Sequence, residues 1–221
     1  VIVDGNPSNR IDDLRVTLAE AGYDVDANVD GVGKLVGNFP QFRQDGVTGF
    51  DANFPLRGGD AEFFELANLP FQTRAIGYDS DQAVVRAIQD DPTAVIASAD
   101  LLHSDDGFGN GPNELFTISQ TGADLEAAPW QPISISARDA VTGEQRQFNV
   151  IAIIEPQATG VLFNDLFGVF GGIEVVSDMT DGGFEDTFFL TTVDGSKSFE
   201  DQVAKGIEST LLERGVQARS I

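Results

Sequence analysis

The stretch TFFLTTVDGSKSFEDQVAKGIESTLLERGVQARSI, residues 187–221, predicts a strand, a helix and a second strand in that order. Its helix ends with TLLERG at residues 210–215, and near the start of the chain another helix ends with TLAEAG at residues 17–22. Thr, Leu, Glu and Gly occupy the same register in both segments. Each glycine falls where a helix C-terminus favours a residue that tolerates positive φ, and the residues after it alternate as in a half-buried strand.

This similarity predicts two β-α-β units, one at each end of the chain, that combine into an α+β, ferredoxin-like layer of helices on an antiparallel sheet. We expect residues 1–38 and 186–221 to form this subdomain, and residues 39–185 to form an inserted subdomain of mixed helices and strands. The alternative is a chance similarity between two ordinary amphipathic helices. In either case we expect both termini in one small domain, which suits a module inserted between two other elements.

The chain is strongly acidic, with 36 Asp and Glu against 13 Lys and Arg and a formal net charge of −23. Nucleic acid is not an expected partner because phosphate binding needs a basic surface, and anionic membrane surfaces would repel the chain. The acids are spread along a sequence that also holds 17 Phe, which indicates a folded domain. A dense acidic surface with few lysines is typical of proteins in very salty water, where screening removes self-repulsion. We therefore expect a halophilic source; an ordinary acidic secreted domain is the alternative.

Cysteine is absent, which removes disulfides, thiolate metal sites and thiol chemistry. The sequence has no apolar run of about 18 residues, so we expect no segment to span a membrane. It has no signal peptide and begins at Val1 without methionine, so we expect an excised fragment or a processed product.

Local patterns predict the elements of the chain. Helices are expected at residues 9–21, 60–68, 80–90 and 164–170, and in the last unit of the chain. The expected caps are Asn9 for the first helix, Asp79 or Ser80 for the third, and a capping box of Ser198 and Asp201 for the last. Strands are expected at residues 23–36, 93–99 and 173–176, and a β-hairpin is expected from residues 133–138 and 146–154 around Thr142-Gly143.

Several acidic positions have the spacing of cation ligands. Asp24, Asp26, Asn28 and Asp30 resemble the start of a calcium loop, but an EF-hand needs Gly at its sixth position and Glu at its twelfth, where this chain has Val29 and Leu35. A strand with one solvated face gives the same spacing. Two looser sets are open to weak cation binding or to plain solvation: Asp105, Asp106 and Asn110; and Asp178, Asp181, Glu185 and Asp186.

Other candidate chemistry has weaker support. His103 is the only histidine, and the chain has no G-x-S-x-G elbow for a catalytic serine. Gly31-x-Gly33 and Gly107-x-Gly109-x-Gly111 lack the strand-to-helix context and basic residues of a phosphate loop. Paired carboxylates for glycoside hydrolysis are compatible with so many acids, although only Trp130 and two Tyr are available for sugar stacking. We assign no catalytic, cofactor-binding or metal-binding residue and expect no cofactor.

Three stretches resemble the extracytoplasmic domain of FtsX-like ABC transporter permeases, the family that includes MacB-type exporters. They are residues 74–99, starting with RAIGYDSDQAV; residues 148–154, FNVIAII; and the closing strand at residues 188–190 with the helix that leads to residues 215–221. The resemblance implies a domain looped out between the first and second transmembrane helices of a permease, with a ferredoxin-like part built from both ends and an inserted part. It also implies that a separate cytoplasmic subunit or domain hydrolyses ATP and that the outer domain couples those cycles to substrates or partner proteins. The strong acidity departs from the family, and a halophilic archaeon, which has no periplasm, would lack the partners of Gram-negative exporters.

The expected function is therefore that of a non-enzymatic module on the extracellular side of the cell membrane, within an ABC permease. Its expected partners are a cytoplasmic ATP-binding subunit, reached through transmembrane segments, and an extracellular substrate or protein of unknown identity, with a dimer in the full transporter. A secreted or anchored module that binds a carbohydrate or a cation is the alternative. A hydrolase with clustered carboxylates is a third hypothesis, which nothing in the spacing favours.

Overall fold

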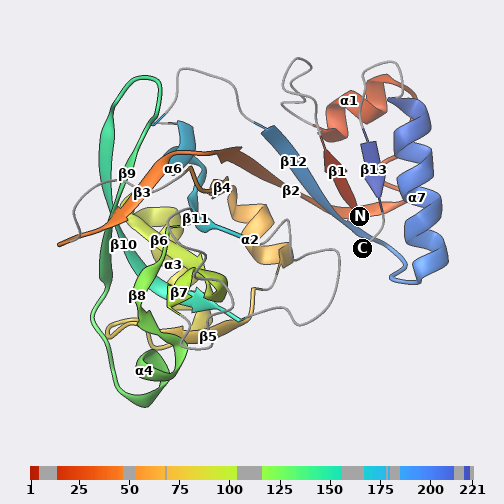
Figure 1. Cartoon of the computed structure of the whole chain (residues 1–221). Helices are drawn as coiled ribbons and strands as arrows, with labels where there is room; N and C mark the ends of the chain where they lie inside the picture. Colours follow the sequence, from red (N-terminus) through yellow and green to blue (C-terminus); the bar gives the residue numbers. More distant parts are fainter. Residues whose placement is uncertain are drawn as a thin grey trace. The chain divides into compact units, whose positions relative to one another are not determined.

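The computed structural model describes residues 1–4, 14–46, 53–67, 69–103, 116–155, 167–177, 179, 185–211 and 217–219. The chain forms two compact units (Figure 1). Unit 1 comprises residues 1–37, 59–68 and 183–221, and unit 2 comprises residues 38–58 and 69–182. The subdomain boundaries expected from the sequence stay a prediction; they differ from these units in the placement of residues 38, 59–68 and 183–185.

Unit 1 is built on a sheet with the strand order β13-β1-β12-β2, in which each neighbouring pair is antiparallel. The strands are β1 (Ile2–Asp4), β2 (Val29–Asn38), β12 (Glu185–Thr192) and β13 (Gln217–Arg219). Helix α1 (Leu14–Glu20) follows β1, and helix α7 (Lys197–Thr210) follows β12. The two β-α-β units therefore interlock in the ferredoxin-like manner, and the predicted α+β fold class is confirmed.

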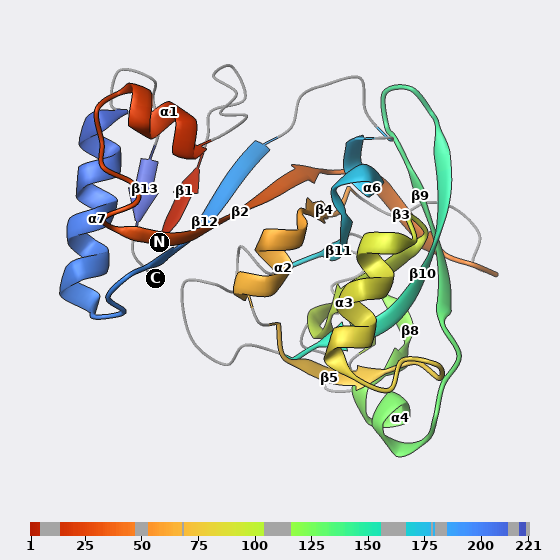
Figure 2. The same cartoon turned by 180° about the vertical axis from the view of Figure 1, so that it is seen from behind.

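Helices α1 and α7 cover one face of this sheet (Figure 2). The core between them and the sheet consists of aliphatic side chains and one aromatic: Val1, Val3, Leu14, Leu18, Val25, Val29, Phe188, Leu190, Val203, Ala204, Ile207 and Leu211. Because side chains alternate along a strand, Phe189 points to the opposite face of β12. There its ring meets Phe63 of helix α2 (Ala61–Ala67), with the ring centres 5.0 Å apart. The sheet of unit 1 thus has helices on both faces.

Unit 2 holds a larger mixed sheet in the order β4-β11-β6-β10-β9-β3, with β5 pairing the far end of β10. Its strands are β3 (Gln41–Gln44), β4 (Leu56–Gly59), β5 (Phe71–Arg74), β6 (Ala94–Ser98), β9 (Ile133–Arg138), β10 (Gln145–Ile154) and β11 (Val169–Gly172). A parallel pair, β7 (Leu102–His103) and β8 (Ile118–Thr121), lies outside this sheet. In the described part of this unit, the helical segments are α3 (Asp81–Asp90), the 3-10 turn Ala99–Leu101, α4 (Gly122–Ala127) and α6 (Ile173–Ser177).

Several predicted elements are confirmed. Helix α2 falls inside the predicted residues 60–68, and α3 starts behind Ser80, whose hydroxyl accepts a hydrogen bond from the amide of Ala83. Strand β6 lies within predicted residues 93–99, and all five of its residues are buried. Strands β9 and β10 form the predicted hairpin, whose turn has Gly143 at φ +74°.

Four local predictions are wrong within the described residues. The predicted strand 23–36 begins at Val29, because Asn28 and Val29 donate to the Val25 carbonyl and form a turn. The predicted strand 173–176 is helix α6, in which burial of Val175 and Val176 outweighs β propensity. The predicted helix 164–170 ends on residues that belong to β11, and its first three residues lie outside the described part.

The predicted capping box at Ser198 and Asp201 is the fourth error. The N-cap of α7 is Ser196, two residues earlier. The Asp194 carboxylate accepts the Ser196 amide at 2.8 Å, and the Ser196 carbonyl accepts the first α-helical bond, from the Glu200 amide at 3.0 Å. A local turn at Asp194 therefore fixes the helix start. For the N-terminal helix, residues 14–20 are helical as predicted, while Asn9 lies outside the described residues.

Candidate functional site

Both ends of the described chain lie in adjacent strands of one sheet. Strands β1 and β13 pair antiparallel with the register Ile2↔Arg219, Val3↔Ala218 and Asp4↔Gln217. On its other side β1 pairs with β12, and the Val1 carbonyl accepts the Leu190 amide at 2.8 Å. Since antiparallel partners lie about 5 Å apart, a chain that enters through β1 and leaves through β13 does so side by side.

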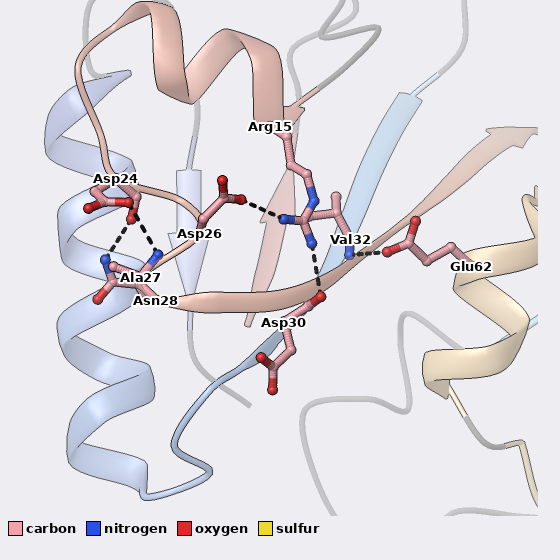
Figure 3. A network of polar contacts seen from close by, with 8 residues as sticks. All are labelled: Arg15, Asp24, Asp26, Ala27, Asn28, Asp30, Val32 and Glu62. Atoms are coloured by element: carbon pink, nitrogen blue, oxygen red, sulfur yellow. Dashed lines mark hydrogen bonds and ion pairs between the residues drawn. The ribbon is translucent and has the colours of Figure 1, made fainter.

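The predicted calcium-like positions do not converge on one point (Figure 3). The Asp24 carboxylate accepts the Ala27 amide at 3.2 Å, while the side chain of Asn28 donates to the Asp24 main-chain oxygen at 2.7 Å. Asp26 instead pairs with Arg15 of α1, at 3.2 Å. The solvated-strand interpretation is also wrong for residues 24–28, which form a bend and a turn. These polar groups hold the turn before β2.

Arg15 ties this turn to helix α1. Its Nη1 pairs with the Asp26 carboxylate and its Nη2 donates to the main-chain oxygen of Asp30 at 3.0 Å (Figure 3). The pair is solvent-exposed, so its Coulomb energy is small, roughly 0–1 kcal/mol. The second contact, to a backbone oxygen at the start of β2, fixes where the strand begins.

Two carboxylates of the α2 region bind the backbone of β2. Asp60 Oδ1 accepts the amide of Lys34 at 3.1 Å. Glu62 Oε1 accepts the amide of Val32 at 2.8 Å (Figure 3). Asp60 also caps the helix, because the same oxygen accepts the Phe63 amide at 2.7 Å. In return, the Asp60 amide donates to the Lys34 carbonyl at 3.1 Å. Two β2 amides thus bond to side-chain carboxylates, which satisfies groups that an unprotected strand edge would expose.

The Gly31-x-Gly33 pattern serves the packing of α2 on β2. A Cβ on Gly33 would meet the backbone of Phe63, lying 2.6 Å from its nitrogen, and a Cβ on Gly31 would lie 2.9 Å from a methyl carbon of Leu66. Only glycine allows the helix to approach the strand this closely. The sequence shows two glycines within a predicted strand. Their packing partner, helix α2, lies in another part of the chain, so the spacing of the glycines could not identify it.

The remaining candidates are distributed over unit 2. His103 is exposed on β7, opposite Thr121 of β8. Trp130 is buried to 9% exposure, and its ring nitrogen donates to the Thr73 hydroxyl at 3.0 Å, so this ring supports the fold. Among the described residues, no group of three or more His, Asp or Glu is placed to hold a metal ion.

The acidic loop with Asp105, Asp106 and Asn110, the glycines 107–111, and Asp178 and Asp181 lie outside the described residues, as do the side chains of Glu185 and Asp186. In the part of the chain that is described, no helix is both long and apolar enough to cross a membrane.

The sequence matches no protein-family model and no curated protein. Among solved structures, the extracellular domain of the ABC-type transporter YknZ from Gram-positive bacteria overlaps with a TM-score of 0.49 at 13% identity, over 97% of this chain and 91% of that one. The periplasmic region of MacB from Actinobacillus actinomycetemcomitans overlaps with a TM-score of 0.48 at 13% identity, over 98% and 86%. A domain of a permease protein from Porphyromonas gingivalis has a TM-score of 0.45 at 8% identity, over 98% and 86%. At these scores and identities the overlaps assign neither a function nor a partner to this chain.

Proposed function

We propose that this chain is the extracellular domain of an FtsX-like ABC transporter permease. The observation that carries the proposal is the antiparallel pairing of β1 with β13, which brings both ends of the chain together on one sheet. A domain inserted between two transmembrane helices needs such neighbouring ends. The sequence resemblance described above supports the same assignment.

In this proposal the sheet of unit 1 receives the motion of the membrane segments. A membrane helix that precedes β1 would displace β1, and one that follows β13 would displace β13. Because β1 pairs with both β13 and β12, either displacement reaches all three strands. The hydrogen bonds of the ladder resist shear along the strands, so the unit moves as one body. The outer domain then couples ATP-driven motion to export or to a partner protein outside the cell.

The proposed domain is not an enzyme. In the family that it resembles, a cytoplasmic ATP-binding subunit or domain hydrolyses ATP, and the outer domain contributes no catalytic residue. The proposed partners are that subunit, a substrate or protein outside the membrane, and a second permease in a dimer.

The hydropathy of the parent protein on both sides of this segment tests the proposal. We expect an apolar stretch of about 20 residues before Val1 and several more after Ile221. A signal peptide before Val1, followed by a polar linker or the end of the protein after Ile221, would contradict the permease and indicate a secreted binding module.

A further inference from the structure

In unit 2, strand β5 is tied at two points to the segment that leads from α4 to β9. The Thr73 hydroxyl donates to the Leu125 carbonyl at 3.1 Å, and the Ile76 amide donates to the Trp130 carbonyl at 2.8 Å. Between these points the segment carries Ala, Ala and Pro at residues 127–129, whose side chains are small. An open hollow of about 510 Å³ is lined by the strand and the segment, and it is large enough for a small ligand.

Aromatic and aliphatic side chains form much of the wall of this hollow, which we call the β5 hollow. The ring of Trp130 is fixed there, because its nitrogen donates to the Thr73 hydroxyl at 3.0 Å. Tyr78 is half-buried, and Ile76 is 51% exposed although it is apolar. A ligand whose carbon atoms cover these side chains removes apolar surface from water, which favours binding.

The charged residues of the β5 hollow favour a cation. Among the described residues that line it, only Arg74 is basic, and its guanidinium forms an ion pair with Asp81. The other two charged lining residues, Asp79 and Glu126, are exposed carboxylates. Within the described part of the chain, neither forms an ion pair with a basic side chain. A cation gains from these carboxylates and from the rings beside them, because the face of an aromatic ring also attracts positive charge.

Gln72 favours a ligand with N–H groups. Its side-chain nitrogen donates to the Glu126 carboxylate at 2.5 Å, which leaves its oxygen as an acceptor. That oxygen is shielded from water and has no hydrogen-bond partner among the described residues. A buried acceptor without a partner destabilises the protein, and a donor that draws the Gln72 side chain toward the hollow removes this cost.

Other classes of ligand fit the β5 hollow less well. A metal ion needs several oxygen ligands, and among the described residues no group of three or more His, Asp or Glu is placed to hold one. An anion would be repelled by a chain with a net charge of −23. An uncharged ligand would displace water from Asp79 and Glu126 and leave both carboxylates without a counter-charge.

We propose that the β5 hollow binds a primary ammonium group carried on an aliphatic chain, as in an alkylamine or a lysine side chain. The ammonium lies between the carboxylates of Asp79 and Glu126 and the ring of Tyr78. The aliphatic chain packs on Ile76 and Trp130. The ligand is a free amine or the lysine of a partner protein, and a titration distinguishes these two sources. The proposal does not depend on membership of a permease.

Tryptophan fluorescence tests this site directly, because Trp130 is the only tryptophan of the chain and lines the hollow. The whole chain is titrated, in KCl at which it is folded, with pentylammonium and with the methylamide of Nα-acetyl-lysine. Pentanol and pentanoate are the controls, because they carry the same aliphatic chain without a positive charge. We expect a saturable change with at least one of the two ammonium compounds and none with the controls. Tighter binding of the lysine compound indicates a partner protein, and tighter binding of pentylammonium indicates a free amine.

Variants assign the binding to the proposed groups. Glu126→Gln keeps an acceptor for Gln72 and removes the charge, so the Kd should weaken by about threefold. Tyr78→Ala removes the ring and should weaken the Kd by about fivefold, whereas Tyr78→Phe keeps the ring and should bind as the parent chain does. Glu65→Gln removes an equal charge from an exposed position in unit 1 and should leave the Kd unchanged.

Three results would overturn the proposal. The first is no saturable change with either ammonium compound at millimolar concentration, or an equal change with pentanol. The second is equal weakening of the Kd by Glu126→Gln and Glu65→Gln, which would mean attraction to the overall charge alone. The third is an unchanged Kd in Glu126→Gln and Tyr78→Ala variants that unfold at the same temperature as the parent chain.

Discussion

Among the described glycines of unit 1, Gly33 is the one where an added Cβ would lie closest to another residue. Its missing side chain lets the backbone of α2 approach β2, and no rotation of a side chain can relieve the contact because the neighbouring atoms of Phe63 belong to its backbone. Gly31 differs, since the Leu66 methyl groups that it faces can move. We therefore expect a side chain to be tolerated better at Gly31 than at Gly33.

Gly33→Ala should lower the free energy of unfolding by about 1–3 kcal/mol, because the chain must shift to accept the new methyl group. Gly195→Ala is the matched control, since a Cβ there meets nothing within 4 Å. We expect the control to stay within about 0.5 kcal/mol of the parent in urea unfolding. Equal effects of the two substitutions would show that α2 does not pack closely on β2.

Asp139 makes the hairpin turn of unit 2 sensitive to acid. The backbone amide of Thr142, at 2.7 Å, and that of Val141, at 2.8 Å, hold the pKa of the Asp139 carboxyl below its usual range. A lowered pKa in the folded state means that the carboxylate stabilises the fold above its unfolded pKa of about 3.9. This stabilisation is lost as the pH falls through the folded pKa.

The Asp139→Asn variant should therefore have a lower melting temperature than the parent chain at pH 6. The difference between the two melting temperatures, here called the gap, should narrow between pH 4 and pH 3. The Asn side chain does not titrate and cannot lose a charge in acid. Melting followed by circular dichroism at pH 6, 4 and 3 measures the gap. A gap that stays constant over this range would contradict the role assigned to the Asp139 charge.

Helix α2 is the element whose place depends most on side chains. Asp60 bonds at once to the first turn of α2 and to the Lys34 amide of β2, so one carboxylate joins the helix to the strand. Glu62 adds a second bond, to Val32. Phe63 then covers the far face of the sheet against Phe189.

Asp60→Ala should destabilise the protein by about 1–3 kcal/mol, because it removes a helix cap and leaves the Lys34 amide without its acceptor. Hydrogen exchange at the Lys34 amide should become faster in the same variant. Glu65→Ala removes an equal charge from the exposed side of α2 and should change neither quantity. Unchanged hydrogen exchange at the Lys34 amide in Asp60→Ala would show that the Asp60 carboxylate does not join α2 to β2.

Helix and strand positions were predictable where neighbouring residues in the sequence determine them. TLAEAG predicted a helix end at Gly22, and there Gly22 has φ +87° while the Tyr23 amide donates to the Leu18 carbonyl at 2.9 Å. The matching glycine of TLLERG, Gly215, lies outside the described residues.

Predictions failed where distant contacts or short polar turns decide the outcome. Val175 and Val176 have strand propensity but are buried on a helix, and Asp24 holds a turn where alternation predicted a strand. The hydrogen bond from the Lys34 amide to the Asp60 carboxylate joins residues 26 positions apart, and no periodic pattern in the sequence predicts it.

The charge of the whole molecule sets its response to salt. With a formal net charge of −23, the folded chain is destabilised by self-repulsion that salt screens. We expect the melting temperature to rise steadily between about 0.1 M and 2 M KCl, where the Debye length falls below about 10 Å. Melting in KCl measures this effect. A flat or falling melting temperature over this range would contradict the expected adaptation to salty surroundings.

The most direct test of the permease proposal is the side of the membrane on which this domain lies in the full-length protein. Val141 is 94% exposed at the tip of the β9-β10 hairpin, and this chain has no cysteine, so Val141→Cys offers a thiol that the unsubstituted protein lacks in this domain. A membrane-impermeant maleimide is added to intact cells, and labelling is measured in the membrane fraction, with the unsubstituted protein as control. The account predicts equal labelling in intact and in lysed cells. Labelling only after lysis, or a protein found in the medium and not in the membrane fraction, would contradict it.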